Sequence, residues 1–247
     1  MALNPRNTTV MDQTGSRAEI DAGQRSYMLR VYNYMSLGVA FTGVIVLLMA
    51  ANPSLMVSIA TGGTKWLLFG GLLAMGWLSP KIMTMRSTAA AHAFFWAYAA
   101  LWGVMISPMV AYFLQTTSGT MDVARAFFIT SGMFAGASIF GYVTKKDLSA
   151  FGRFFMMAAI GLLIAIVVNA FFIKSTGFSL ITSGFAVLLF AGMTAWETQK
   201  IKSMYYQAAG NTELLGRMAI FGAFQLYGSF VVMFIHMLSI IGIMRGE

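Results

Sequence analysis

Residues 178–196 read FSLITSGFAVLLFAGMTAW, a run of apolar and small side chains without a single charge. A helix that crosses the hydrocarbon core of a bilayer needs about 20 predominantly apolar residues. The run is long enough for one crossing, and a carboxylate, Glu197, follows it directly. The stretch therefore predicts a transmembrane helix with an acidic residue at its edge.

The composition of the whole chain favours the same class. Of the 247 residues, 58% are hydrophobic and only 10% are charged, whereas soluble domains carry roughly 25% charged residues. Cysteine is absent, which excludes disulfides and thiolate metal sites. The first 28 residues are polar and lack the apolar stretch of a signal peptide. We expect an all-α polytopic membrane protein, with a cytoplasmic tail over residues 1–28 and one transmembrane domain over residues 29–247.

Apolar runs divide this domain into seven predicted spans, each judged against the length that a bilayer requires. They are Val31–Ala51, Trp66–Met83, Ala89–Leu114, Val123–Val143, Phe154–Ile173, Phe178–Glu197 and Met218–Ile243. The connections are short, except for a polar connector from Thr198 to Arg217.

The basic residues predict the orientation of these spans. With the N-terminus in the cytoplasm, twelve of the 16 lysines and arginines fall on the cytoplasmic side, and the other four are Lys65, Arg125, Lys174 and Arg245. This asymmetry follows the positive-inside rule. It explains the net charge of +8 without a nucleic-acid partner. We expect a protein of the bacterial inner (plasma) membrane, whose partner is the lipid bilayer itself.

Glu197 is the main candidate functional residue, because an acid at the edge of hydrocarbon is costly. One interpretation pairs it with Lys200, which lies three residues further along the same helix face. An acid near a helix C-terminus opposes the helix dipole, however. The other interpretation is a desolvated carboxylate that responds to pH or binds a cation in passing, because burial disfavours its charged form.

Other polar residues are candidates for the surroundings of Glu197. Gln225, Ser229 and His236 share one face of the last span, and such a face either bonds to neighbouring helices or lines a conduction pathway. Arg86 and Lys81 fall on the same side as Glu197 and are candidates to pair with it, unless they only reach for lipid headgroups.

Three further features concern the structure of the bundle. Asp147 is a candidate cap for the helix that follows it. Pro108 predicts a bend in the third span. The GxxxG pattern of Gly132 and Gly136 permits close helix contact, which we expect within the monomer.

Signatures of catalysis are missing from the sequence. It contains no GxSxG, HExxH or Walker motif, and no span holds a pair of acids. We therefore expect no enzymatic activity, no catalytic residues, no cofactor and no resident metal.

Three segments, taken together, resemble the Bax inhibitor-1 (TMBIM) family of membrane proteins. Phe140–Ser149 reads FGYVTKKDLS, similar to the family's FGYxTKxDLS, and Trp196–Lys202 reads WETQKIK, similar to YDTQKIK. Gly222–Tyr227 (GAFQLY) matches the opening of the family's last helix. The likeness runs from the first span to Gly242 and is strongest to the bacterial branch that includes the YccA-like inner-membrane proteins.

The resemblance implies a seven-helix protein that leaks Ca²⁺ in a pH-sensitive way. In the family, two buried aspartates in the last two helices close the leak, with an arginine nearby. The corresponding residues here are Glu197, Ser229 (in LYGSF, where the family has LYLDF) and, for the arginine, Arg86. The acid pair is thus broken, which leaves one carboxylate facing a hydroxyl.

Three functions follow as hypotheses. The first is a pH-sensitive cation (Ca²⁺) leak gated by Glu197, with Ser229, Arg86, Gln225 and His236 along the pathway. The second is a non-conducting protein whose polar tail contacts a membrane-bound quality-control protease, as is thought of YccA-like members. The third, proton-coupled transport of a solute, lacks matching pairs of broken spans and ranks last.

Overall fold

The computed structural model describes residues 5–116, 118–208 and 210–246, and its elements are all helical there. The helices are α1 (Pro5–Ala50), α2 (Pro53–Thr61), α3 (Thr64–Leu78), η1 (Ser79–Thr84), α4 (Thr88–Leu114), α5 (Gly119–Val143), α6 (Ser149–Val168), η2 (Asn169–Ile173), α7 (Thr176–Gln207) and α8 (Thr212–Arg245). Within the described residues, seven helical segments are long and apolar enough to cross a membrane. The prediction of an all-α bundle with seven spans is therefore confirmed.

The last helix, α8, forms the centre of the bundle. It packs against α1, α4, α5, α7 and η1. By contrast, α6 packs mainly against α7 and its own extension η2. Half of the most apolar window of α8 is buried, compared with 11% for the α6–η2 span. The outer helices therefore present most of their apolar surface to lipid, and the polar residues of α8 face other helices.

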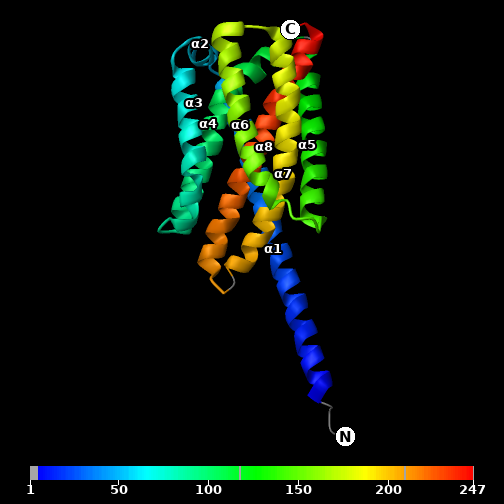
Figure 1. Cartoon of the computed structure of the whole chain (residues 1–247). Helices are drawn as coiled ribbons and strands as arrows, with labels where there is room; N and C mark the ends of the chain where they lie inside the picture. The colour runs from blue at the N-terminus through cyan, green and yellow to red at the C-terminus, as the bar shows by residue number, and fades with distance from the viewer. Residues whose placement is uncertain (1–4, 117, 209, 247) are drawn as a thin grey trace.

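Apart from Ala51, which follows the end of α1, the predicted spans lie in helical segments, and several of these helices are much longer than the spans. The connector predicted from Thr198 to Arg217 is mostly helix, because α7 continues to Gln207 and α8 begins at Thr212. The predicted tail likewise belongs to α1 from Pro5 onwards. In Figure 1 the N-terminal part of α1 and the α7–α8 turn extend beyond the neighbouring connections at the same end of the bundle.

Side chains at the helix ends explain several boundaries. Ser87, Ser175 and Asn211 each accept a hydrogen bond from a backbone N–H in the first turn of α4, α7 and α8, which satisfies a donor that the helix itself leaves free. Pro80 lies in η1, a 3-10 segment that ends the second span. The short helix α2, between the first two spans, was not predicted.

The GxxxG pattern does not mediate helix contact inside this molecule. A Cβ atom added at Gly132 or Gly136 would meet no atom within 4 Å. The close contact occurs instead at Gly141, where an added Cβ would lie 2.1 Å from the carbonyl oxygen of Ala195. The glycine that lets α5 touch the backbone of α7 thus belongs to the FGYVTKKDLS segment.

Candidate functional site

Glu197 lies inside α7 and is buried, with 5% of its surface exposed. Within the described residues, its side chain accepts one hydrogen bond, from Ser229 of α8, whose Oγ donates to Oε2 over 2.7 Å. Ser229 is buried as well, with 3% exposed. The two positions that the resemblance aligned with the family's acids therefore meet across the α7–α8 contact.

No cation neutralises this carboxylate among the described residues. The three ion pairs found there join Arg125 and Arg245 to Asp122, and Arg217 to Glu213. The Lys200 ammonium lies over the aromatic rings of Trp196 and Phe221, 5.0 and 5.7 Å from their centroids. The predicted partner Arg86 is exposed in the connection between η1 and α4, and the ion pairs of the described residues do not include it.

Gln225 lies one helical turn before Ser229 on α8. Its Oε1 atom is buried and has no hydrogen-bond partner among the described residues. Unpartnered buried acceptors are uncommon in proteins and call for an explanation such as a water molecule or an ion. The structure thus leaves one free oxygen acceptor on the turn next to the Glu197–Ser229 pair.

His236 lies seven residues beyond Ser229, towards the other end of α8. Its Nδ1 atom is 3.2 Å from the Oγ of Ser183 in α7, and Ser183 also contacts Ser239 at 3.5 Å. The polar face of the last helix therefore forms hydrogen bonds to α7 at two separate depths of the bundle. Bonding to a neighbouring helix was one of the two roles predicted for this face, and lining a conduction pathway was the other. Of the residues predicted for the pathway, the structure joins Glu197 and Ser229 directly.

The two motifs that flank the site bind to one another. The Nε2 atom of Gln199 donates to the Lys146 carbonyl and its Oε1 accepts from the Leu148 N–H, both over 2.8 Å. Lys202 donates from Nζ to the Tyr142 carbonyl over 2.9 Å. These bonds, with the close contact at Gly141, hold the segment of α7 that carries Glu197 against α5 and the connection after it.

Asp147 completes this connection in the way the sequence predicted. Its Oδ1 accepts a hydrogen bond of 2.8 Å from the Ser149 N–H at the start of α6. This bond favours the charged carboxylate and lowers the pKa of Asp147 below its ordinary value.

A second acidic site, at the opposite end of the bundle, was missed by the sequence analysis. The Asp122 side chain is fully buried and pairs with Arg245 at the end of α8 and, over 3.4 Å, with Arg125. Ser118 donates to the same carboxylate over 3.2 Å. A signal was available: Asp122 is the only acidic residue between Asp21 and Asp147, and the topology placed it on the same side as Arg125 and Arg245.

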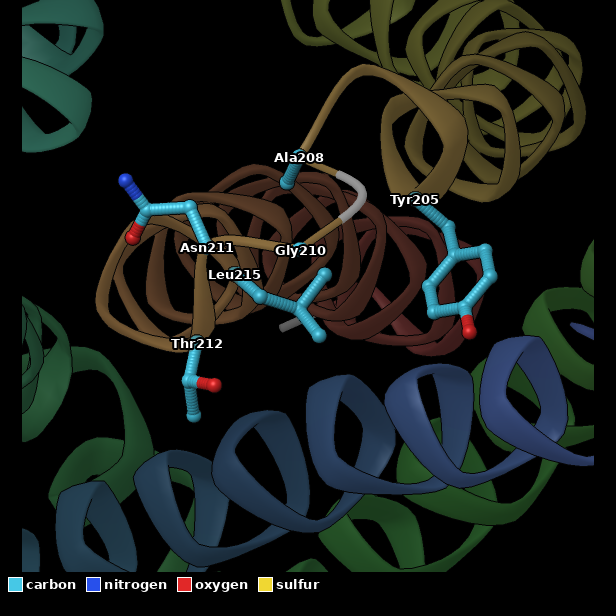
Figure 2. Close-up of a pocket in the computed structure, with 6 residues that line it drawn as sticks. All are labelled: Tyr205, Ala208, Gly210, Asn211, Thr212 and Leu215. Carbon is cyan, nitrogen blue, oxygen red and sulfur yellow. The ribbon is translucent and has the colours of Figure 1, made fainter.

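A small hollow of about 120 Å³ lies at the α7–α8 turn. Figure 2 shows its six lining residues, with Tyr205 between the turn and α1 and Asn211 on the other side. The lining is Tyr205, Ala208, Gly210, Asn211, Thr212 and Leu215. It offers no acid or histidine, and no group of three or more potential metal ligands exists within the described residues. The hollow is therefore not the candidate site.

Comparison with known proteins gives matches over most of the chain. Residues 24–246 match the model of a family described as "Inhibitor of apoptosis-promoting Bax1". The chain is similar to an uncharacterized protein of Rickettsia prowazekii, with 37% identity over 95% of this chain and 97% of the relative. It is also similar to the inner membrane protein YbhL of Escherichia coli K12, with 33% identity over 90% and 93% of the two chains, and to the uncharacterized protein YrjE of Lactococcus lactis, with 31% identity over 98% of each.

Proposed function

Because the chain belongs to the Bax inhibitor-1 family of membrane proteins, we propose that it conducts cations, Ca²⁺ among them, through its bundle in a pH-dependent way, with Glu197 as the gate. It is a multi-pass membrane protein with seven spans. We place its N-terminus in the cytoplasm, from the distribution of basic residues.

The observation that carries the proposal is a buried carboxylate, Glu197, that takes part in none of the ion pairs of the described residues. Glu197 is enclosed by α7 and α8 and receives a hydrogen bond only from the Ser229 hydroxyl among the bonds of the described residues. Leaving a carboxylate unpaired in such a place costs stability, and acids inside membrane proteins typically mark ion or proton pathways. A proton or a passing cation would each relieve the cost.

The oxygen atoms near Glu197 are better suited to a cation that passes through than to one that is tightly bound. Ca²⁺ takes about 6–8 oxygen ligands, commonly including several carboxylates. Here the Glu197 carboxylate of α7 meets the Ser229 hydroxyl of α8, and Gln225, whose Oε1 has no hydrogen-bond partner among the described residues, lies one helical turn before Ser229. A conducting site has to bind weakly enough to release its ion, so this oxygen-poor set supports a leak. Protonation of Glu197 would remove the charge that attracts the cation, which makes flux fall in acid.

Ca²⁺ flux into proteoliposomes tests the proposal. We expect Glu197→Gln to lower the flux about tenfold, since a unit charge 4 Å from a cation is worth about 1–4 kcal/mol in environments ranging from water to a protein surface. Glu213→Gln, which removes the exposed carboxylate of the pair with Arg217, is the matched control and should conduct like the wild type. Unchanged flux in Glu197→Gln liposomes would refute the proposal.

An interaction with a membrane-bound protease is a second candidate function, favoured by the reach of α1. Its N-terminal part extends beyond the bundle (Figure 1), and its inner portion is anchored, because Gln24 donates to the Lys202 carbonyl and Tyr27 packs beside Tyr205. Deleting residues 2–18 keeps these anchors. If the protein is a non-conducting partner of the protease, the deletion abolishes co-purification of the protease and leaves the fold intact, as thermal unfolding in detergent would show.

A further inference from the structure

An open groove of about 680 Å³ runs between α6 and α7 on the outside of the bundle. It is lined by Ser149, Gly152, Arg153, Met156, Met157 and Trp196. Its size lies within the range of small-molecule sites, about 300–1,000 Å³. The indole of Trp196 forms its floor, since a Cβ added at Gly152 would lie 2.6 Å from the ring. Any side chain at Gly152 would displace that floor.

The groove faces the surroundings of the bundle, which are lipid for most of the length of α6. The span from Ser149 to Ile173 contains the most apolar 18-residue window of the seven spans, and only 11% of that window is buried. Met156 and Met157 are 54% and 66% exposed. The groove lies at the first two turns of α6, next to the polar connection that holds Lys145 and Lys146. It therefore spans the boundary between headgroups and acyl chains, the depth at which tryptophan is enriched.

The one charged residue that lines the groove is basic. Arg153 is exposed, and the lining residues include no acid. Asp147, the nearest acid along the chain, accepts hydrogen bonds from the N–H and the side chain of Ser149. The ion pairs of the described residues do not include Arg153. A guanidinium at the headgroup level is well suited to a phosphate, which it can bind through two parallel hydrogen bonds.

We propose that this groove binds one anionic phospholipid. The Arg153 guanidinium binds the headgroup phosphate, and an acyl chain lies along Met156 and Met157 above the Trp196 ring. The charge complementarity, the apolar inner wall and the opening to lipid all favour this occupant over a soluble anion. The inference is independent of the proposed function, because it uses neither Glu197 nor ion flux.

Quenching of Trp196 fluorescence by brominated lipids tests the proposal. The other four tryptophans (Trp66, Trp77, Trp96 and Trp102) are replaced by phenylalanine, and the protein is placed in phosphatidylcholine vesicles to which brominated phosphatidylglycerol or brominated phosphatidylcholine is added. We expect the anionic lipid to bind about fivefold more tightly, as one basic residue near an anionic lipid predicts. Arg153→Gln should abolish this preference, while Lys81→Gln, which removes an exposed lysine of η1 outside the groove, should keep it.

Three outcomes would overturn the proposal: equal quenching by both lipids, a preference that survives Arg153→Gln, or loss of the quenching when inorganic phosphate is added. The last would assign the site to a soluble anion. If the variant with a single tryptophan does not fold, native mass spectrometry of the wild type, Arg153→Gln and Lys81→Gln answers the same question. More retained phosphatidylglycerol on the wild type and Lys81→Gln than on Arg153→Gln supports the site, and equal retention refutes it.

Discussion

At the scale of single residues, the contact between Glu197 and Ser229 is the feature from which the proposed gating follows. Ser229→Asp would place a second carboxylate within hydrogen-bond distance of the first. Two acids in contact share a proton and titrate as a pair, so we expect Ca²⁺ flux to respond more steeply to pH than in the wild type. Ser229→Asn, similar in size and neutral, is the control. Equal pH responses of the two variants would show that the serine is not part of the gate.

Gly141 gives a prediction about packing. Gly141→Ala would drive a methyl group into the backbone of Ala195, and such overpacking costs about 1–3 kcal/mol. Gly136→Ala changes the same helix in the same way, but its methyl group meets no atom within 4 Å. Thermal unfolding in detergent should therefore show a lower midpoint than the wild type for Gly141→Ala and an unchanged midpoint for Gly136→Ala. Equal midpoints would mean that α5 and α7 are not in close contact here.

At the scale of helices, Asp122 ties the beginning of α5 to the end of α8. Asp122→Asn leaves Arg245 and Arg125 without their carboxylate. Breaking a fully buried pair costs about 3–5 kcal/mol. Both arginines are partly exposed, at 30% and 54%, so we expect a smaller loss, on the order of 1–3 kcal/mol.

The control for Asp122→Asn is again Glu213→Gln, because the Glu213 side chain is 61% exposed and its pair with Arg217 is a surface contact. Thermal midpoints measured side by side should fall clearly for the first variant and hardly at all for the second. A similar small change in both would mean that the Asp122 cluster does not hold the helix ends together.

The helices themselves could be predicted, whereas most of their contacts could not. Long apolar runs identify seven spans, because the bilayer sets a minimum length. The end of α7 was placed too early and the start of α8 too late, since a polar helix outside the membrane has no apolar run to reveal it. The periodicity of α8 put Gln225, Ser229 and His236 on one face, but periodicity does not tell which helix that face meets. Only the family resemblance paired Ser229 with Glu197.

At the scale of the whole molecule, the orientation in the membrane is a prediction that the absence of cysteine makes easy to test. Lys146→Cys places a thiol in an exposed position and Lys65→Cys places one in a partly exposed position, at opposite ends of the bundle. With the N-terminus in the cytoplasm, a membrane-impermeant maleimide added to intact spheroplasts should label Lys65→Cys alone. Labelling of Lys146→Cys alone would reverse the topology.

The groove between α6 and α7 and the Glu197–Ser229 contact share one element of this architecture. Trp196, the floor of the groove, precedes Glu197 in α7, and the Lys200 ammonium lies over its ring. The sequence pattern indicated no such groove, because its walls come from two helices whose relative placement depends on Gly152. A lipid in the groove would thus contact the segment that carries the proposed gate.

The central claim is that the charge of Glu197 controls cation flux, and the most direct measurement is Ca²⁺ flux in proteoliposomes stepped from mildly alkaline to mildly acidic buffer. For the wild type, we expect flux to fall as the pH falls, because a proton on Glu197 removes the charge that attracts the cation. For Glu197→Gln, we expect low flux that is the same at both pH values. A Glu197→Gln protein whose flux still fell with pH in the same proportion as the wild type would contradict the account.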